Sequence, residues 1–296
     1  MTDFIGTLAN CLLIGTEKIG PGWHFQNFIS ANLDGFVVEL RQKEGYSTSR
    51  GKIFEGETHF TTDLTIKDVP RSQVDTVRDL IRDIAELLSF ITCSEVYCHK
   101  EIYGEKEKWL SGNGIVQTSW KIIEIHGKAT KLYLEKAWPN YRKLRQSRQL
   151  NVILDYYVLS QKPNLPIEAR LVFMFVLLEN LKHTYACHIG YPIFNNNFYP
   201  SGTTLAMMRR RSGRPQHKGF KTLLTEMFGN VGMNPSLTDI IDLRNEIIHS
   251  GVSRLSFDDR FQKYVSCQNL FREYFLRLLD YFGKFKLCEE DVYRTM

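Results

Sequence analysis

An arginine and a histidine five residues apart could act together on a phosphodiester. They are Arg244 and His249, in the stretch Arg-Asn-Glu-Ile-Ile-His that precedes Ser250 and Gly251. A guanidinium presents a planar pair of donors that fits phosphate oxygens, and an imidazole exchanges a proton near neutral pH. Asn245 adds an amide that could bind the phosphate or orient His249. Cleavage of RNA by its own 2′-hydroxyl needs such groups and no metal ion or other cofactor, so these three residues are the candidate catalytic set.

The segment that must position them, 236–250, has the apolar periodicity of an amphipathic helix. Gly251 is the residue type that commonly ends a helix in the left-handed conformation. Arg244 falls in the middle of the apolar arc, where its permanent charge needs an anionic or hydrogen-bonding partner. The arc is formed by Leu237, Ile240, Ile241, Leu243, Ile247 and Ile248.

On a straight helix, Arg244 and His249 point about 140° apart. One helix therefore does not aim both at one small target. They would converge if the last turn were distorted, or if two copies of the helix packed together. We expect the second arrangement, a composite site in a homodimer. The alternative is a surface helix whose arginine pairs with an acidic neighbour and whose histidine caps its end.

A carboxylate that could serve Arg244 lies in an earlier predicted helix, 167–186. Glu179 and His183 follow its uninterrupted apolar run, 171–178, and they share one face because they are four residues apart. We expect Glu179 to be the counter-ion of Arg244 and His183 to support the site. The alternative is that the helix simply reaches solvent there.

The motif at the end of its helix, preceded by Leu243, resembles the R-x4-6-H motif of the HEPN superfamily. The order of predicted helices, which ends on Leu276-Arg277-Leu278-Leu279-Asp280-Tyr281-Phe282-Gly283, is similar to the ApeA-like HEPN branch. The resemblance covers residues 146 to 285, about half of the chain. The helices lie at 146–160, 167–186, 222–228, 236–250 and 260–281.

The resemblance implies an all-α domain that acts as a metal-independent endoribonuclease, with Arg244 and His249 as its catalytic residues and an acidic residue near Glu179. It further implies bacterial antiphage defence by abortive infection, with RNA as partner, tRNA as one candidate substrate and a phage-derived trigger. Two alternatives stay open: a non-catalytic HEPN-fold module that binds RNA or protein, and a toxin held by an antitoxin.

The most basic stretch of the chain, 208–221, contains glycine and proline and is predicted to be a flexible loop that contacts RNA phosphates. Its alternative is a solvated surface loop. The residues expected to bind RNA are Arg209, Arg210, Arg211, Arg214 and Lys218. A second, weaker basic patch is either another RNA contact or a helix face, and it comprises Arg142, Lys143, Arg145 and Arg148.

The first half of the chain alternates like β-strands, with strands expected at 25–33, 35–41, 58–66 and 115–125 and one helix after Pro70. The predicted fold is therefore α+β: a β-rich N-terminal domain with one helix, residues 1–140, followed by an all-α HEPN-like helical bundle, residues 141–296. By analogy, the N-terminal domain would be a sensor or regulator.

Composition narrows the class of protein. A chain of 296 residues with 43% hydrophobic and 24% charged residues is typical of a globular protein. No charged-then-apolar leader opens it and its longest apolar run has eight residues, so we expect a cytoplasmic protein without a membrane partner. Residues 1–145 have no net charge, and the whole excess of +5 lies in residues 146–296.

The cysteines predict neither disulfides nor a metal site. Six scattered cysteines fit a reducing compartment, where they act as small buried hydrophobes. Cys93, Cys98 and His99 lack a second pair of ligands at zinc-site spacing, and so do Cys187 and His188.

Overall fold

The computed structural model describes most of the chain, and its fold is α+β. The described residues are 1–11, 17–19, 24–26, 28–43, 57–112, 114–115, 121–124, 127–210, 212–213, 215–251, 253–290 and 292–296.

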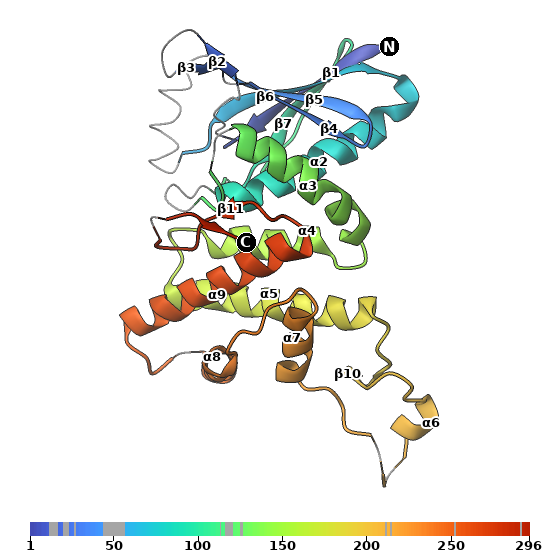
Figure 1. Cartoon of the computed structure of the whole chain (residues 1–296), viewed down its shortest axis with the longest axis vertical. Helices are drawn as coiled ribbons and strands as arrows, with labels where there is room; N and C mark the ends of the chain where they lie inside the picture. Colours follow the sequence, from blue (N-terminus) through green and yellow to red (C-terminus); the bar gives the residue numbers. More distant parts are fainter. Residues whose placement is uncertain are drawn as a thin grey trace.

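An antiparallel six-stranded sheet forms one end of the molecule (Figure 1). Its strand order is β4 (Phe28–Leu33), β5 (Phe36–Gln42), β6 (Phe60–Val69), β1 (Thr2–Ala9), β7 (Tyr97–Tyr103) and β8 (Lys106–Trp109). Three two-stranded pairs accompany it: β2 (Glu17–Ile19) with β3 (His24–Gln26), β9 (Ile193–Phe194) with β10 (Asn197–Phe198), and β11 (Lys284–Phe285) with β12 (Arg294–Thr295).

Three of the expected strands are confirmed as β4, β5 and β6. Asp34 and Gly35, both with positive φ, make the tight turn between β4 and β5 that their types predict. The strand expected at 115–125 is not found at 121–124, and residues 116–120 and 125 lie outside the described part. The central strand β1 and the exposed, charged edge strand β8 were not expected.

Helices make up the rest of the fold. After a 3₁₀ turn (Arg71–Gln73) come α2 (Val74–Thr92), α3 (Gly127–Leu144), α4 (Leu150–Ser160), α5 (Ile167–His188), α6 (Leu205–Met208), α7 (Phe220–Gly229), α8 (Thr238–Ser250) and α9 (Phe257–Leu278). The five helices predicted in the second half correspond to α4, α5, α7, α8 and α9. None of the helices within the described ranges has the length and apolar character needed to cross a bilayer.

The elements are stacked in layers (Figure 1). Helices α2 and α3 pack on one face of the sheet, α4, α5 and α9 lie beyond them, and α7 and α8 lie at the far end. Phe90 near the end of α2 joins these layers, because its ring contacts Tyr157 of α4 and Phe271 and Phe275 of α9 at centroid distances of 5.5, 5.9 and 4.6 Å.

The expectation of one helix in the first half is wrong, because α3 accompanies α2 there. Helix α3 runs through this point and contains Pro139. The boundary expected between residues 140 and 141 therefore falls within a helix. Buried side chains of both halves form one continuous hydrophobic cluster, so the sheet and the helices share a core.

Three arginines of the weaker basic patch take part in this junction, while Lys143 is exposed, and an RNA contact by the patch stays a prediction. Arg142, in the last turn of α3, and Arg145, just after that helix, form ion pairs with Asp83 of α2. The Asp83 side chain is fully buried. Arg148 is 2% exposed and donates to the Tyr274 hydroxyl at 2.9 Å and the Leu181 carbonyl at 3.2 Å. These arginines hold helices together.

Candidate active site on helix α8

The candidate site lies on α8, at the end of the molecule opposite the sheet (Figure 1). Ile240, Leu243 and Ile247 are buried and attach the helix to the core. Gly251 ends the helix as predicted: it has a φ of 74°, and its N–H donates to the Ile247 carbonyl at 2.8 Å. The last turn is therefore regular and contains His249.

The Arg244 guanidinium is held by three groups. Its Nη2 donates to the carboxylate of Glu179 on α5, and its Nη1 donates to Asn245 Oδ1 at 2.8 Å. The guanidinium also lies over the Phe220 ring at the start of α7, 4.9 Å from the centroid, which favours a cation. The ion pair expected from the position of Arg244 in the apolar arc is present, and the side chain is 22% exposed.

A second cation shares these partners. Lys182 Nζ lies 2.7 Å from the other oxygen of Glu179 and 5.2 Å from the centroid of the Phe220 ring. One carboxylate thus serves two cations, which leaves the cluster of Arg244, Lys182 and Glu179 with one net positive charge. Such a cluster orients the arginine and retains attraction for an anion.

His249 is exposed in the last turn of α8. Within the described part of the chain, no hydrogen bond or ion pair engages its imidazole. Ile248 beside it is also exposed, at 46%. The amide of Asn245 is bound to Arg244, so among the described contacts it orients the arginine and not the histidine.

Arg244 and His249 do not meet in one chain. Arg244 faces α5 and α7, whereas His249 is five residues further along a regular helix and points about 140° away. The distorted last turn that would bring them together is absent from α8, whose described backbone is helical to Ser250.

His183 does not join the Arg244 cluster. Its Nε2 lies 3.6 Å from Cys187 Sγ, and its ring packs edge-on against Phe198 of β10 with centroids 5.2 Å apart. His183 therefore packs on the β9–β10 hairpin. Among the described contacts, none joins His183 to Arg244.

The basic loop divides into three parts. Arg209 and Arg210 follow α6 and are exposed. The Lys218 ammonium forms an ion pair with Glu226 and lies 4.7 Å from the Tyr191 ring centroid. The Lys218 backbone forms an isolated β-bridge with Phe198. The Glu226 carboxylate raises the pKa of Lys218. Lys218 is therefore already paired within the chain, its contact with RNA stays a prediction, and Arg211 and Arg214 lie outside the described residues.

Phe220 and Lys182 are site residues that the sequence did not indicate. Phe220 reads as an ordinary apolar residue at the start of a helix, and Lys182 reads as a solvated surface charge. Their roles arise because α5, α7 and α8 come together, and local periodicity carries no information on that contact.

Most cysteines are buried, as expected, but Cys187 is exposed. Cys93 and Cys98 lie in the core. Over the described ranges, no group of three or more histidine, cysteine, aspartate or glutamate side chains is arranged to hold a metal ion.

Comparison with protein-family models, curated proteins and solved structures finds no match for this chain. The resemblance to the HEPN superfamily stays a prediction from the motif and the order of helices.

Proposed function

We propose that the protein is a metal-independent endoribonuclease that acts as a homodimer, with α8 of each subunit at the interface. The observation that carries the proposal is the arrangement of α8. It presents an arginine oriented by Glu179, Asn245 and Phe220, and an exposed histidine in its final turn.

The two side chains supply what cleavage by the 2′-hydroxyl needs. A base removes the 2′-hydroxyl proton, the 2′-oxygen bonds to phosphorus, and the bond from phosphorus to the 5′-oxygen breaks as that oxygen takes a proton. His249 is the proton carrier, and Arg244 balances the charge on the phosphorane oxygens. The products are a 2′,3′-cyclic phosphate and a 5′-hydroxyl.

In a homodimer, Arg244 and His249 could act on one phosphate although they point in different directions on the same helix. One side of α8 is exposed and carries Asn245, Ile248 and His249. A twofold axis next to this side would bring two copies of the helix together. Arg244 of one subunit and His249 of the other would then face one phosphate. Arg209 and Arg210 offer further phosphate contacts, and the net charge of +5 favours a polyanion.

The biological role that we propose is antiphage defence, in which toxic cleavage of RNA, with tRNA as candidate substrate, halts infection. This step depends on the resemblance to the ApeA-like HEPN branch.

The direct test is RNA cleavage with EDTA present, comparing the wild type with Arg244→Ala and His249→Ala. The matched control is His188→Ala, because His188 is also an exposed histidine in the last turn of a helix, α5. We expect both α8 variants to lose cleavage by about a hundredfold or more, and the control to retain it. Full cleavage by a folded His249→Ala protein would remove the mechanism.

A second candidate function is supported by the Glu179 ion pair, which already balances much of the Arg244 charge. In that case the chain is a non-catalytic module that uses α8 to bind RNA or protein. The same assay separates the two: a binding module would show no cleavage in the wild type, while Arg244→Ala would weaken RNA binding in a filter assay.

A further inference from the structure

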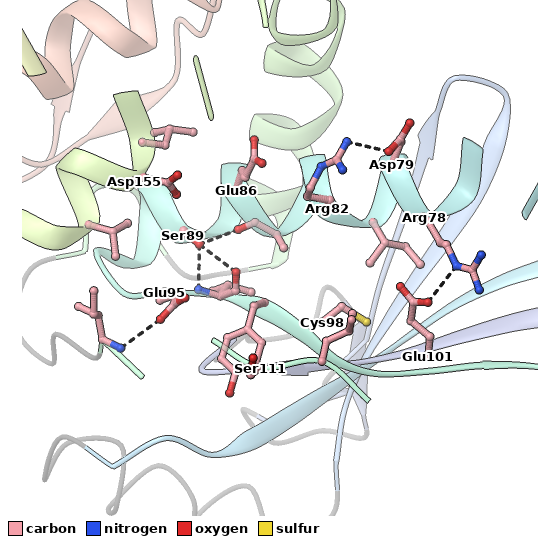
Figure 2. A pocket seen from close by; sticks show the side chains of 18 of the residues that line it. Arg78, Asp79, Arg82, Glu86, Ser89, Glu95, Cys98, Glu101, Ser111 and Asp155 are labelled. Atoms are coloured by element: carbon pink, nitrogen blue, oxygen red, sulfur yellow. Dashed lines mark hydrogen bonds and ion pairs between the residues drawn. The ribbon is translucent and has the colours of Figure 1, made fainter. Parts of the chain in front are cut away.

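The two faces of the sheet differ around β7 and β8. The face toward α2 is hollowed by a pocket of about 790 Å³. Figure 2 shows that the arginines of this pocket are already bound: Arg78 pairs with Glu101 at 3.0 Å, and Arg82 pairs with Asp79 at 2.7 Å. No helix of the described ranges covers the opposite face (Figure 1). On that opposite face, aromatic rings gather at the β8 side of the sheet.

Trp109 of β8 lies on the face away from α2. It is paired with Lys100 of β7, and Lys100 is paired with Thr7 of β1. Residues that are directly opposite in neighbouring strands share a face of the sheet, so these three side chains point the same way. Gly6 faces the other way because successive residues alternate, and a β-carbon on Gly6 would lie 3.8 Å from Ile81 of α2.

Three rings from three strands contact one another on this face. His99 of β7 stacks on Phe60 of β6 with centroids 3.9 Å apart, and the His99 and Trp109 rings meet edge-on at 5.0 Å. A register shift leaves His99 opposite no residue of β1, and such a bulge re-aims a side chain. Phe60 is 43% exposed and Trp109 is 59% exposed. These three residues form an aromatic patch whose two outer rings are held by their neighbours but remain in contact with water.

Lysines border the aromatic patch. The Lys100 ammonium lies 4.7 Å from the centroid of the indole ring and pairs with Glu107 at 2.7 Å. Lys106 and Lys108 of β8 are exposed, and neither forms an ion pair with another described residue. The acidic side chains here are Glu107 and the exposed Glu105 in the turn before β8, so the three lysines leave an excess of one positive charge.

Exposed aromatic rings with neighbouring lysines suit a single strand of nucleic acid. Each unpaired base offers an apolar face that stacks on a ring, and the phosphates between bases interact with ammonium groups. A duplex cannot use the rings in this way, because its bases are stacked on one another. The choice of RNA as the stacking ligand rests on the proposed function.

We propose that the aromatic patch of Phe60, His99 and Trp109 binds single-stranded RNA, with a base stacked on each of the two exposed rings and phosphates bound by the lysines of β8. The patch belongs to the sheet, whereas α8 lies beyond α5 and α9 (Figure 1). The patch therefore selects unpaired RNA and holds it on the chain, and it takes no part in the cleavage step.

The test is fluorescence anisotropy of a short, labelled 2′-O-methyl oligouridylate titrated with the full chain. This probe has no free 2′-hydroxyl, so the proposed mechanism cannot cleave it and the titration measures binding alone. We expect Trp109→Ala to weaken binding about tenfold, which corresponds to the loss of one stacked base, and Trp109→Phe to restore most of the affinity. The matched control is Phe282→Ala, which removes a ring that is 63% exposed and lies outside the patch.

Salt separates stacking from charge. A plot of the logarithm of the binding constant against the logarithm of the salt concentration should keep its slope in Trp109→Ala, because an aromatic ring releases no counterions. Lys106→Ala should make that slope shallower by about 0.7, the value for one phosphate contact on a single strand. An RNA duplex of the same length should bind wild type and Trp109→Ala equally.

Four results would each overturn the inference: no binding of the oligouridylate, equal weakening by Trp109→Ala and Phe282→Ala, no recovery in Trp109→Phe, or equal weakening of duplex and single strand by Trp109→Ala. The cleavage assay with EDTA tests α8 separately. A chain that binds the probe through Trp109 but cleaves no RNA would contradict only the proposed function.

Discussion

Arg244 is a permanently charged side chain in the apolar stripe of a helix. A carboxylate on another helix, that of Glu179, forms the ion pair that its charge requires. Glu179 takes its hydrogen bond, Asn245 takes a second, and the Phe220 ring supports its flat face. A guanidinium held in this way keeps one orientation, as the proposed role at a phosphorane would require.

Glu179→Gln should reduce RNA cleavage, because the amide cannot hold the guanidinium as a carboxylate does. We expect a loss of about 1 kcal/mol in the free energy of unfolding, since the Glu179 side chain is 34% exposed and its pair is partly screened. The control is Glu168→Gln, which weakens a similar pair with Arg260. Equal cleavage by the two variants in the EDTA assay would mean that the Glu179 pair is only structural.

Glu86 should make stability depend on pH. Its pKa is raised to about 7: burial is the largest cause, Asp83 and Asp155 add to the rise, and the Tyr141 hydrogen bond and Arg145 oppose it. The folded state therefore prefers the protonated form. The contribution to stability is complete below the ordinary pKa of 4.5 and is lost as pH rises to about 7.

Glu86→Gln should remove that dependence. Its free energy of unfolding, measured with urea and compared with the wild type, should increase relative to the wild type from about pH 5 to about pH 8. Glu105→Gln should follow the wild type. A difference between Glu86→Gln and the wild type that stays constant with pH would contradict the prediction.

At the scale of elements, α8 joins a buried face to an exposed C-terminal end, which carries His249 of the proposed catalytic pair. Ile240, Leu243 and Ile247 fix the helix, and Gly251 fixes where it stops. The position of His249 therefore depends on one residue in the left-handed conformation.

Gly251→Ala should cost about 1 kcal/mol of stability, because alanine is strained at a φ of 74° although no atom lies within 4 Å of its added carbon. It should also lower cleavage, since the last turn of α8 would fray. Gly190→Ala is the control, with a φ of 80° and similar open space after α5. Circular dichroism melts and the cleavage assay check both effects, and equal cleavage by the two variants would refute the link.

At the scale of the whole molecule, sheet and helices share one core, while α8 lies beyond α5 and α9, on the side away from the sheet (Figure 1). The proposed second subunit would bind at this end. If the site is shared between two subunits, two inactive variants should complement each other, which a site within one chain would not allow.

Mixing inactive Arg244→Ala with inactive His249→Ala should restore activity. Half of the dimers would be mixed and each would contain one intact composite site, so we expect about a quarter of wild-type cleavage. Light scattering should report a dimer for the wild type and both variants. Failure of the mixture to cleave, with subunit exchange confirmed, would rule out a site shared between subunits.

The sequence by itself determined the features that depend on neighbours along the chain. The periodicity of α8, its glycine end and the helices α2, α4, α5, α7 and α9 are local properties, and the misfit of Arg244 predicted a partner such as Glu179. The central strand β1 was missed because only Phe4 and Leu8 mark its buried face, with Gly6 between them.

Only the tertiary structure decided which charges are available. In the sequence, Lys218 cannot be distinguished from Arg209 and Arg210 of the same basic stretch, yet in the structure it is bound to Glu226. Arg142, Arg145 and Arg148 read as a basic surface, yet they join helices. The physical reason is that an ion pair depends on which helices meet in space, and residues far apart in the sequence make that choice.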